Sequence, residues 1–213
     1  MQKDKTRQYR VLVSYLTPSW EDPVVHNDID FLVDLLIHGD SSPMYKAILK
    51  PGLAVKFFQN GFSDDTYNTY VTFGFEGVAE ADVDKVISLI QETLEECYKE
   101  GFDQQRADAL IHENELYSHE LTKNMGLTFF SRIVTTTCYG IDPHKMLDSN
   151  FYLDNIRAHL KENPKFYQEM IKKVFLDNNH KLTVVVKPVD GFLDRSNNKI
   201  KEDLAEKKAH LKQ

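Results

Sequence analysis

The sequence has few of the residues that crosslink a chain or anchor it in a membrane. Two cysteines, Cys97 and Cys138, occur among its 213 residues, which is too few for a disulfide framework. We expect two reduced thiols, with Cys97 packed in the core as a small apolar side chain. No apolar run approaches the ~18 residues of a membrane span, and residues 1–8 are polar and carry no secretory signal. The composition therefore predicts no membrane partner.

Basic residues are outnumbered by acidic ones. Lys and Arg total 26 against 33 Asp and Glu, which gives a formal net charge of −7. A nucleic-acid surface needs clustered Lys and Arg to neutralise phosphates, and only Lys56 lies beside the aromatic residues between Phe57 and Phe75. We therefore expect no nucleic-acid partner and predict that these aromatic side chains pack in a core. The negative charge would instead favour the approach of basic peptides.

The remaining composition is that of an ordinary globular domain, with 41% hydrophobic and 28% charged residues. A chain of this length can bury a substantial core without disulfides or metals. No internal repeat and no Gly- or Ser-rich linker interrupts it before residue 188. We predict one domain over residues 1–190, followed by a charged helical tail over 191–213 with Lys, Glu and Asp at helical spacing.

Hydrophobic periodicity predicts strands towards both ends of the chain and helices between them. Strands are expected at 9–16, 55–60, 67–77 and 180–187, with a hairpin turn over 61–65. Helices are expected from the cap Asp22-Pro23 to Gly39, and over 43–49, 83–100, 103–121, 127–139, 151–160 and 164–175. Helices clustered between strands indicate the α+β class, with one antiparallel or mixed sheet covered on one face by helices.

One stretch comes close to a zinc-peptidase motif, namely His112-Glu113-Asn114-Glu115-Leu116. Both H-E-x-x-H and the inverted H-x-x-E-H need His at the fifth position, where this chain has Leu116. His119 shares the helix face of His112 and Glu115, but the two imidazoles are two turns apart, roughly 10 Å along the axis. We interpret this face as solvated helix surface, with adventitious metal binding as the alternative. The sequence predicts no catalytic residue and no metal ligand in this chain.

The order of several segments carries a family resemblance. L-L-I-H-G-D-S-S-P-M-Y-K-A-I-L-K-P-G-L-A runs from Leu35 to Ala54, and Y-N-T-Y-V-T-F-G-F-E-G-V runs from Tyr67 to Val78. Asn163-Pro164-Lys165-Phe166 and His180-Lys181-Leu182-Thr183 follow, so the set covers nearly the whole chain. It resembles the second, non-catalytic domain of the presequence-protease branch of the pitrilysin/insulinase-type zinc metallopeptidases.

This resemblance implies a β-α-β-β-α-α domain that forms part of the chamber wall of a zinc metalloendopeptidase. Such enzymes degrade unstructured peptides, including mitochondrial targeting peptides. The zinc would be bound through an H-x-x-E-H motif in a preceding domain, so this chain would hold no cofactor. The implied partners are the catalytic domain and the C-terminal half of the same polypeptide, together with unstructured peptides. The implied location is the mitochondrial matrix, with the cytoplasm or another organelle left open, and the tail over 191–213 would open the helical linker between the two halves.

The resemblance also makes Gly39, Asp40, Ser41 and Ser42 candidate contacts with a peptide in the chamber. In related processing peptidases the corresponding loop is Gly-rich and borders the substrate chamber. The loop here has one glycine, and its residue types equally suit a junction that ends one helix and caps the next. An alternative function is a stand-alone, non-enzymatic core-type subunit of the same fold that acts in a protein assembly.

Overall fold

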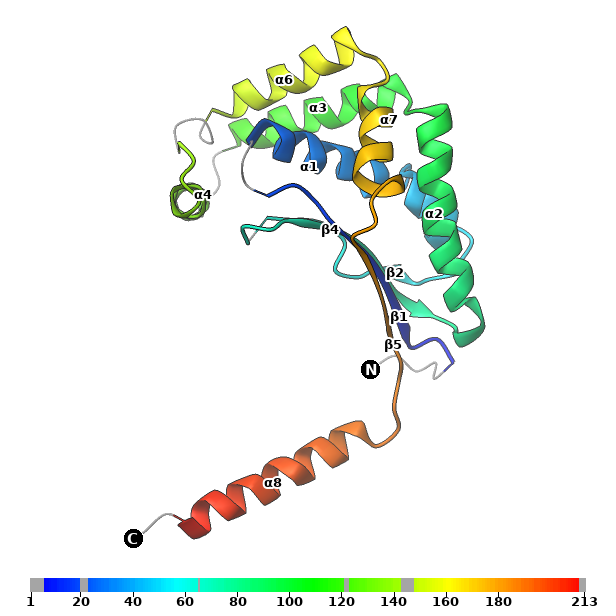
Figure 1. Cartoon of the computed structure of the whole chain (residues 1–213), viewed down its shortest axis with the longest axis vertical. Helices are drawn as coiled ribbons and strands as arrows, with labels where there is room; N and C mark the ends of the chain where they lie inside the picture. The colour runs from blue at the N-terminus through cyan, green and yellow to red at the C-terminus, as the bar shows by residue number, and fades with distance from the viewer. Residues whose placement is uncertain (1–5, 20–22, 65, 121–122, 143–147, 211–213) are drawn as a thin grey trace.

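The computed structural model describes residues 6–19, 23–64, 66–120, 123–142 and 148–210. It has the expected order of a strand, helices, a hairpin, further helices and a final strand (Figure 1). The predicted cap Asp22 lies outside the described residues. The elements are β1 Tyr9–Leu16, α1 Pro23–Ile37, η1 Tyr45–Leu49, β2 Lys56–Phe57, β3 Gly61–Ser63, β4 Tyr70–Val78, η2 Glu80–Asp82, α2 Val83–Glu100, α3 Gln104–His119, α4 Met125–Cys138, α6 Ser149–Glu162, α7 Phe166–Ile171, η3 Lys172–Leu176, β5 Lys181–Val186 and α8 Phe192–His210.

The strands form one sheet in the order β2-β4-β1-β5, with β3 pairing to β4 on the same side as β2. Each of these pairings is antiparallel. β1 is central, since Val11 lies opposite Phe75 of β4 on one side and Val185 of β5 on the other. The sheet therefore joins the two ends of the domain, and the α+β prediction is confirmed.

The edge strand beside β4 differs from the expectation of one strand over 55–60 and a turn over 61–65. Between the β2 and β3 pairings, residues 58–60 stand opposite only two residues of β4, 73 and 74. Gln59 in this segment has a positive φ of 47°. The edge is thus a single strand interrupted by a bulge, and the turn follows β3 instead of preceding it.

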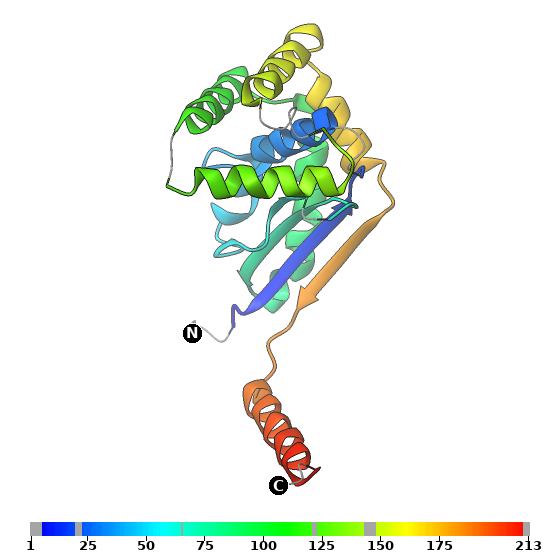
Figure 2. The same ribbon diagram turned by 90° about the vertical axis from the view of Figure 1, so that its left-hand side faces the viewer.

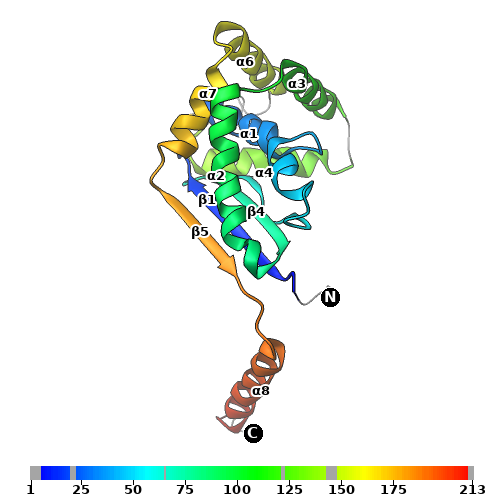
Figure 3. The same cartoon turned by 90° about the vertical axis from the view of Figure 1, so that its right-hand side faces the viewer.

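Helices cover one face of this sheet, as predicted. α2 lies along the sheet (Figure 3). α7 packs against α2, and α1 packs against β3 at the edge of the sheet. The centre of the core is an aromatic group in which Tyr15 of β1 meets Phe73 of β4 and Phe175 of η3 edge to face, with ring centroids 6.2 and 5.2 Å apart. The predicted apolar stripe of α1 is fully buried, at Ile29, Leu32, Val33 and Leu36.

The C-terminal helix α8 projects away from the rest of the domain (Figure 1). Leu193, Ile200 and Leu204 are 68%, 52% and 60% exposed, and their spacing of i, i+7 and i+11 places them on one face of the helix. That apolar stripe is uncovered by the described residues. The division into a domain over 1–190 and a tail over 191–213 stays a prediction. Within the described ranges, no helix combines the length and apolar character that crossing a bilayer requires.

Candidate functional site

The near-match to a zinc motif lies on the outer surface of α3. His112 is 71% exposed, and its Nδ1 lies 3.8 Å from Glu115 Oε2. That same oxygen accepts a hydrogen bond of 3.0 Å from Arg157 of α6, so Glu115 serves as an inter-helix ion-pair partner. The side chain of His119 lies outside the described residues. Within the ranges that the structure describes, no three His, Cys, Asp or Glu side chains gather in a way that could hold a metal ion.

The loop over 39–42 forms the junction between α1, α3 and η1. Gly39 has a φ of +72°, the left-handed conformation that commonly follows the C-terminus of a helix. Ser42 is fully buried, and its Oγ accepts a hydrogen bond of 3.4 Å from the backbone N–H of Tyr45 in η1. Gly39, Asp40 and Ser41 are exposed.

Arg106 of α3 holds this junction together. Its guanidinium donates to the carbonyl oxygens of Asp34, Leu35 and His38 at 3.1, 3.1 and 2.7 Å, and to Ser41 Oγ at 2.6 Å. The last turn of α1 contains no basic residue of its own, so Arg106 supplies the positive charge and the donors that a helix C-terminus favours. Burial lowers the pKa of this guanidinium.

Three of the four candidate residues, Gly39, Ser41 and Ser42, therefore have structural roles in the helical layer. Sequence reasoning identified the junction but missed Arg106, because the contact joins positions about 70 residues apart. Contact between the loop and a peptide stays a prediction. The two exposed side chains that could make it are Asp40 and Ser41.

An apolar surface that the described residues leave uncovered lies on the face of the sheet opposite the helices. Leu182, Val184 and Val186 of β5 are 62%, 38% and 44% exposed, and Leu16 of β1 is 46% exposed. Figure 2 shows β1 and β5 with none of the described helices lying across their length. An apolar surface of this kind marks a site of contact with another domain, a partner or a ligand.

One end of this sheet face is polar. Glu76 of β4 pairs with Arg10 at 3.3 Å and with Lys56 at 3.0 Å. The Arg10 guanidinium also lies 4.2 Å from the centre of the Phe58 ring, a cation–π contact. The face is thus divided into a charged end at β2 and an apolar strip along β5.

Helix α4 adds a further apolar strip that the described part of the chain leaves uncovered. Leu127, Phe130 and Val134 are 66%, 62% and 43% exposed, and their i, i+3 and i+7 spacing aligns them on one face. The sequence predicted this helix but not its outward apolar side. The signal was present in its composition, since Arg132 is the one charged residue between Met125 and Cys138. A surface helix normally carries a charged outer face.

Comparison with known proteins identifies the family. Residues 1–114 match the model of the peptidase M16 inactive domain. The mitochondrial presequence protease of Mus musculus is 35% identical over 205 residues, which cover 96% of this chain and 20% of that protein. The chain thus spans about one fifth of the length of the curated relatives that it matches.

Two solved structures share the fold. An inactive peptidase domain from Bordetella parapertussis superimposes with a TM-score of 0.68 at 15% identity, covering 89% of this chain and 97% of that one. The peptidase M16 inactive domain from Pseudomonas fluorescens gives a TM-score of 0.61 at 14% identity, covering 86% of this chain and 41% of that one. The family match extends over more than half of the sequence, and the chain belongs to the family of peptidase M16 inactive domains.

Proposed function

We propose that this chain is the chamber-forming, non-catalytic domain of a zinc metalloendopeptidase that degrades unstructured peptides such as mitochondrial targeting peptides. The observation that carries the proposal is the similarity to a mitochondrial presequence protease over 96% of the chain. The sequence contains no H-x-x-E-H motif. The zinc and its ligands would therefore belong to another domain of the same polypeptide, and the isolated chain would be inactive.

The uncovered apolar strip on β5 supports a role within a larger protein. Exposed side chains such as Leu182 and Val184 would be covered, or would contact substrate, when the catalytic domain and the C-terminal half enclose a chamber. The exposed stripe of α8, including Ile200 and Leu204, suits the start of a helical linker that pairs with another helix. The proposal includes a location in the mitochondrial matrix, and the mitochondrial presequence proteases among the relatives support a mitochondrial location.

The test is cleavage of a mitochondrial targeting peptide by the full-length polypeptide, with substitutions on this strip. We expect chelator-sensitive cleavage by the unchanged enzyme. The double change Leu182→Asp and Val184→Asp should lower kcat/KM by about tenfold or more, since two charges would meet an apolar surface. The control is Lys85→Asp on the exposed side of α2, which should leave kcat/KM unchanged. A full-length polypeptide that binds no zinc and cleaves no peptide would contradict the proposal.

The second candidate is a non-enzymatic core-type subunit in a protein assembly. The same uncovered strips on β5 and α4 favour it, because they could contact other subunits as well as other domains. Reading the coding sequence on both sides of these residues separates the two. An upstream H-x-x-E-H and a second half downstream support the peptidase, and co-purification with different subunits supports the assembly.

A further inference from the structure

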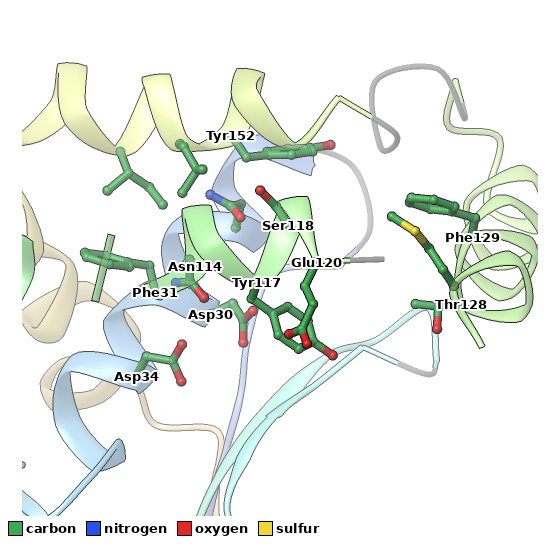
Figure 4. A pocket seen from close by; sticks show the side chains of 14 residues that line it. Asp30, Phe31, Asp34, Asn114, Tyr117, Ser118, Glu120, Thr128, Phe129 and Tyr152 are labelled. Atoms are coloured by element: carbon green, nitrogen blue, oxygen red, sulfur yellow. The ribbon is translucent and has the colours of Figure 1, made fainter. Parts of the chain in front are cut away.

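The edge of the sheet at β5 is open. Beside this strand lies a hollow of about 340 Å³, between Glu92 of α2 and the side chains of Lys181 and Thr183 of β5. The hollow of about 190 Å³ between α1, α3, α4 and α6 lies instead within the helical layer (Figure 4). Among the described strands β5 pairs with β1 alone, and Figures 2 and 3 show it as the outermost strand. The described helices therefore leave this edge free.

The edge at β5 is more regular than the opposite edge of the sheet. β5 pairs with β1 over residues 181–186 without a shift of register, whereas the edge formed by β2 and β3 is interrupted by the bulge over 58–60. Bulges, prolines and charged side chains protect edge strands, because a regular edge is a template for another strand. Lys181, at the first position, is the one charged residue of β5. β5 is thus the edge that can accept a further strand.

The backbone groups of β5 that face outward are assigned from its pairing with β1. The N–H of Leu16 donates a hydrogen bond of 3.0 Å to the carbonyl oxygen of His180. In an antiparallel ladder the hydrogen-bonded pairs recur at every second residue, so the even-numbered residues of β5 are those that bond to β1. The N–H and C=O groups that point away from β1 therefore belong to Lys181, Thr183 and Val185.

We propose that β5 pairs antiparallel with β5 of a second copy of this chain, about a two-fold axis at Thr183. In this register Lys181 lies opposite Val185 of the second copy, and Thr183 lies opposite its counterpart. This is the register in which all three outward-facing residues of one copy pair with the same three of the other. The inference goes beyond the proposed function, because the pairing uses the backbone edge and leaves the apolar face of β5 open to the catalytic domain.

The side chains of this register match one another. On the open face of the sheet, Leu182 lies opposite Val184 of the second copy, in a pair of the type that brings side chains closest. On the helix side the two Thr183 side chains meet. Such a pair of hydroxyls already occurs within the sheet, since the Oγ1 atoms of Thr17 and Thr69 are 2.6 Å apart. β5 is therefore complementary to itself, which favours a second copy as the partner.

Charge and the position of α2 also agree with this register. Shifting the pairing by two residues would place Lys181 opposite Lys187 of the second copy, and like charges directly opposite each other are destabilising. Neighbouring strands lie about 4.8 Å apart, so the two β1 strands would be about 14 Å apart with both β5 strands between them. α2 contacts β1, and its separation from α2 of the second copy would exceed the ~8–10 Å of packed helices. The two α2 helices therefore do not collide.

The test is the mass of this chain in solution, measured by sedimentation equilibrium at rising concentration. We expect the weight-average mass to rise from the 24.7 kDa of one chain toward twice that value. Pairing through one strand edge belongs to the small interfaces, below ~1,200 Å², which are weak. The rise should therefore occur at micromolar concentrations or above. A mass that stays at that of one chain up to the highest soluble concentration would overturn the proposal.

Charged substitutions at the axis locate the contact. Thr183→Asp and Thr183→Lys should each weaken self-association about fivefold or more, because each places two like charges opposite each other. An equimolar mixture of the two variants should associate again, since the introduced charges are then opposite in sign. Thr183 is exposed, so circular dichroism should show an unchanged fold. A mixture that stays monomeric would refute a two-fold axis at this residue.

A proline tests the backbone contact. Thr183→Pro removes an outward N–H but no bond to β1, so it should weaken self-association about tenfold or more and keep the fold. Leu204→Glu, on the exposed stripe of α8, is the control and should leave self-association unchanged. If the control variant is monomeric while the axis variants still associate, the copies meet through α8 and the proposal is wrong. Self-association is measured on this chain and cleavage on the full-length polypeptide, so the two proposals fail separately.

Discussion

The phenol of Tyr167 in α7 donates a hydrogen bond of 3.0 Å to Asp28 Oδ1 in α1. Asp28 is only 2% exposed, and His159 of α6 places its Nδ1 3.1 Å from the same oxygen. Burial, together with the neighbouring carboxylate, raises the pKa of the Tyr167 phenol. This one buried oxygen therefore ties three helices together.

Tyr167→Phe should destabilise the domain by about 1–3 kcal/mol, because a buried carboxylate loses one hydrogen-bond donor. Urea unfolding followed by circular dichroism measures the change. Tyr117→Phe is the control, since that side chain is 71% exposed and its hydroxyl is accessible to water. Equal stability of the two variants would show that the Tyr167–Asp28 bond contributes little.

A second prediction concerns Gly74 in β4. A Cβ at this position would lie 1.8 Å from the carbonyl oxygen of Phe58, whose backbone N–H donates a hydrogen bond of 2.8 Å to the carbonyl of Gly74. Gly74→Ala should therefore cost at least ~2 kcal/mol, since the backbone itself would have to shift. Gly126→Ala in α4 is the matched change, because its Cβ would meet nothing within 4 Å. It should stabilise the domain by up to ~1 kcal/mol through helix propensity.

A third prediction concerns alkaline pH. Burial raises the pKa of Tyr15 from 10.0 to about 12. Between these values the unfolded chain releases the phenol proton while the folded chain keeps it, so stability must fall as the pH rises. The slope for one such group approaches ~1.4 kcal/mol per pH unit. Burial also raises the pKa of Cys97 from 9.0 to about 12, so the fall should begin above pH 9.

Urea unfolding at several pH values between 9 and 12 measures this slope. Tyr15→Phe should reduce it above pH 10, because Phe has no proton to release. Cys97→Ala should reduce it from pH 9 upward. An unchanged slope in both variants would assign the alkaline loss of stability to other groups.

The sequence predicted those elements whose signal is local. Two such predictions are confirmed, namely the strand over 9–16 and the buried helix stripe of Ile29, Leu32, Val33 and Leu36. The repeat of 2 residues in a strand and of 3.6 residues in a helix determines which side chains share a face. The bulge in the edge strand was missed because it depends on the close approach of Phe58 to Gly74. That contact arises only when the strands pair.

The candidate site was harder to predict from the sequence for the same reason. The cap formed by Arg106 joins residues of α1 and α3 that lie about 70 positions apart in the sequence. No local residue spacing predicts such a contact. The alternation of Leu182, Val184 and Val186 looks like that of a buried strand face. Only the tertiary arrangement shows that this face points away from the helices.

A fourth prediction tests the junction loop in the full-length enzyme. If Asp40 and Ser41 border the peptide chamber, Ser41→Trp should change kcat/KM for peptides of several lengths, because an indole would project from an exposed position. Ser41→Ala is the control, since it removes the hydrogen bond from Arg106 without adding bulk. We expect the tryptophan variant alone to alter turnover. Unchanged kcat/KM in both would leave the loop with its structural role only.

The last prediction is that the isolated chain folds but binds no stoichiometric zinc and cleaves nothing. Folding is expected because strand alternation and helix stripes agree with the observed packing. Zinc should not bind with stoichiometric affinity because Leu116 stands where either peptidase motif needs an imidazole, and Glu115 is held by Arg157. Dialysis against zinc, metal analysis and incubation with a targeting peptide measure both properties. One tightly held zinc with chelator-sensitive cleavage would overturn the assignment as a non-catalytic domain, whereas zinc without cleavage would identify the His112 face of α3 as a surface site.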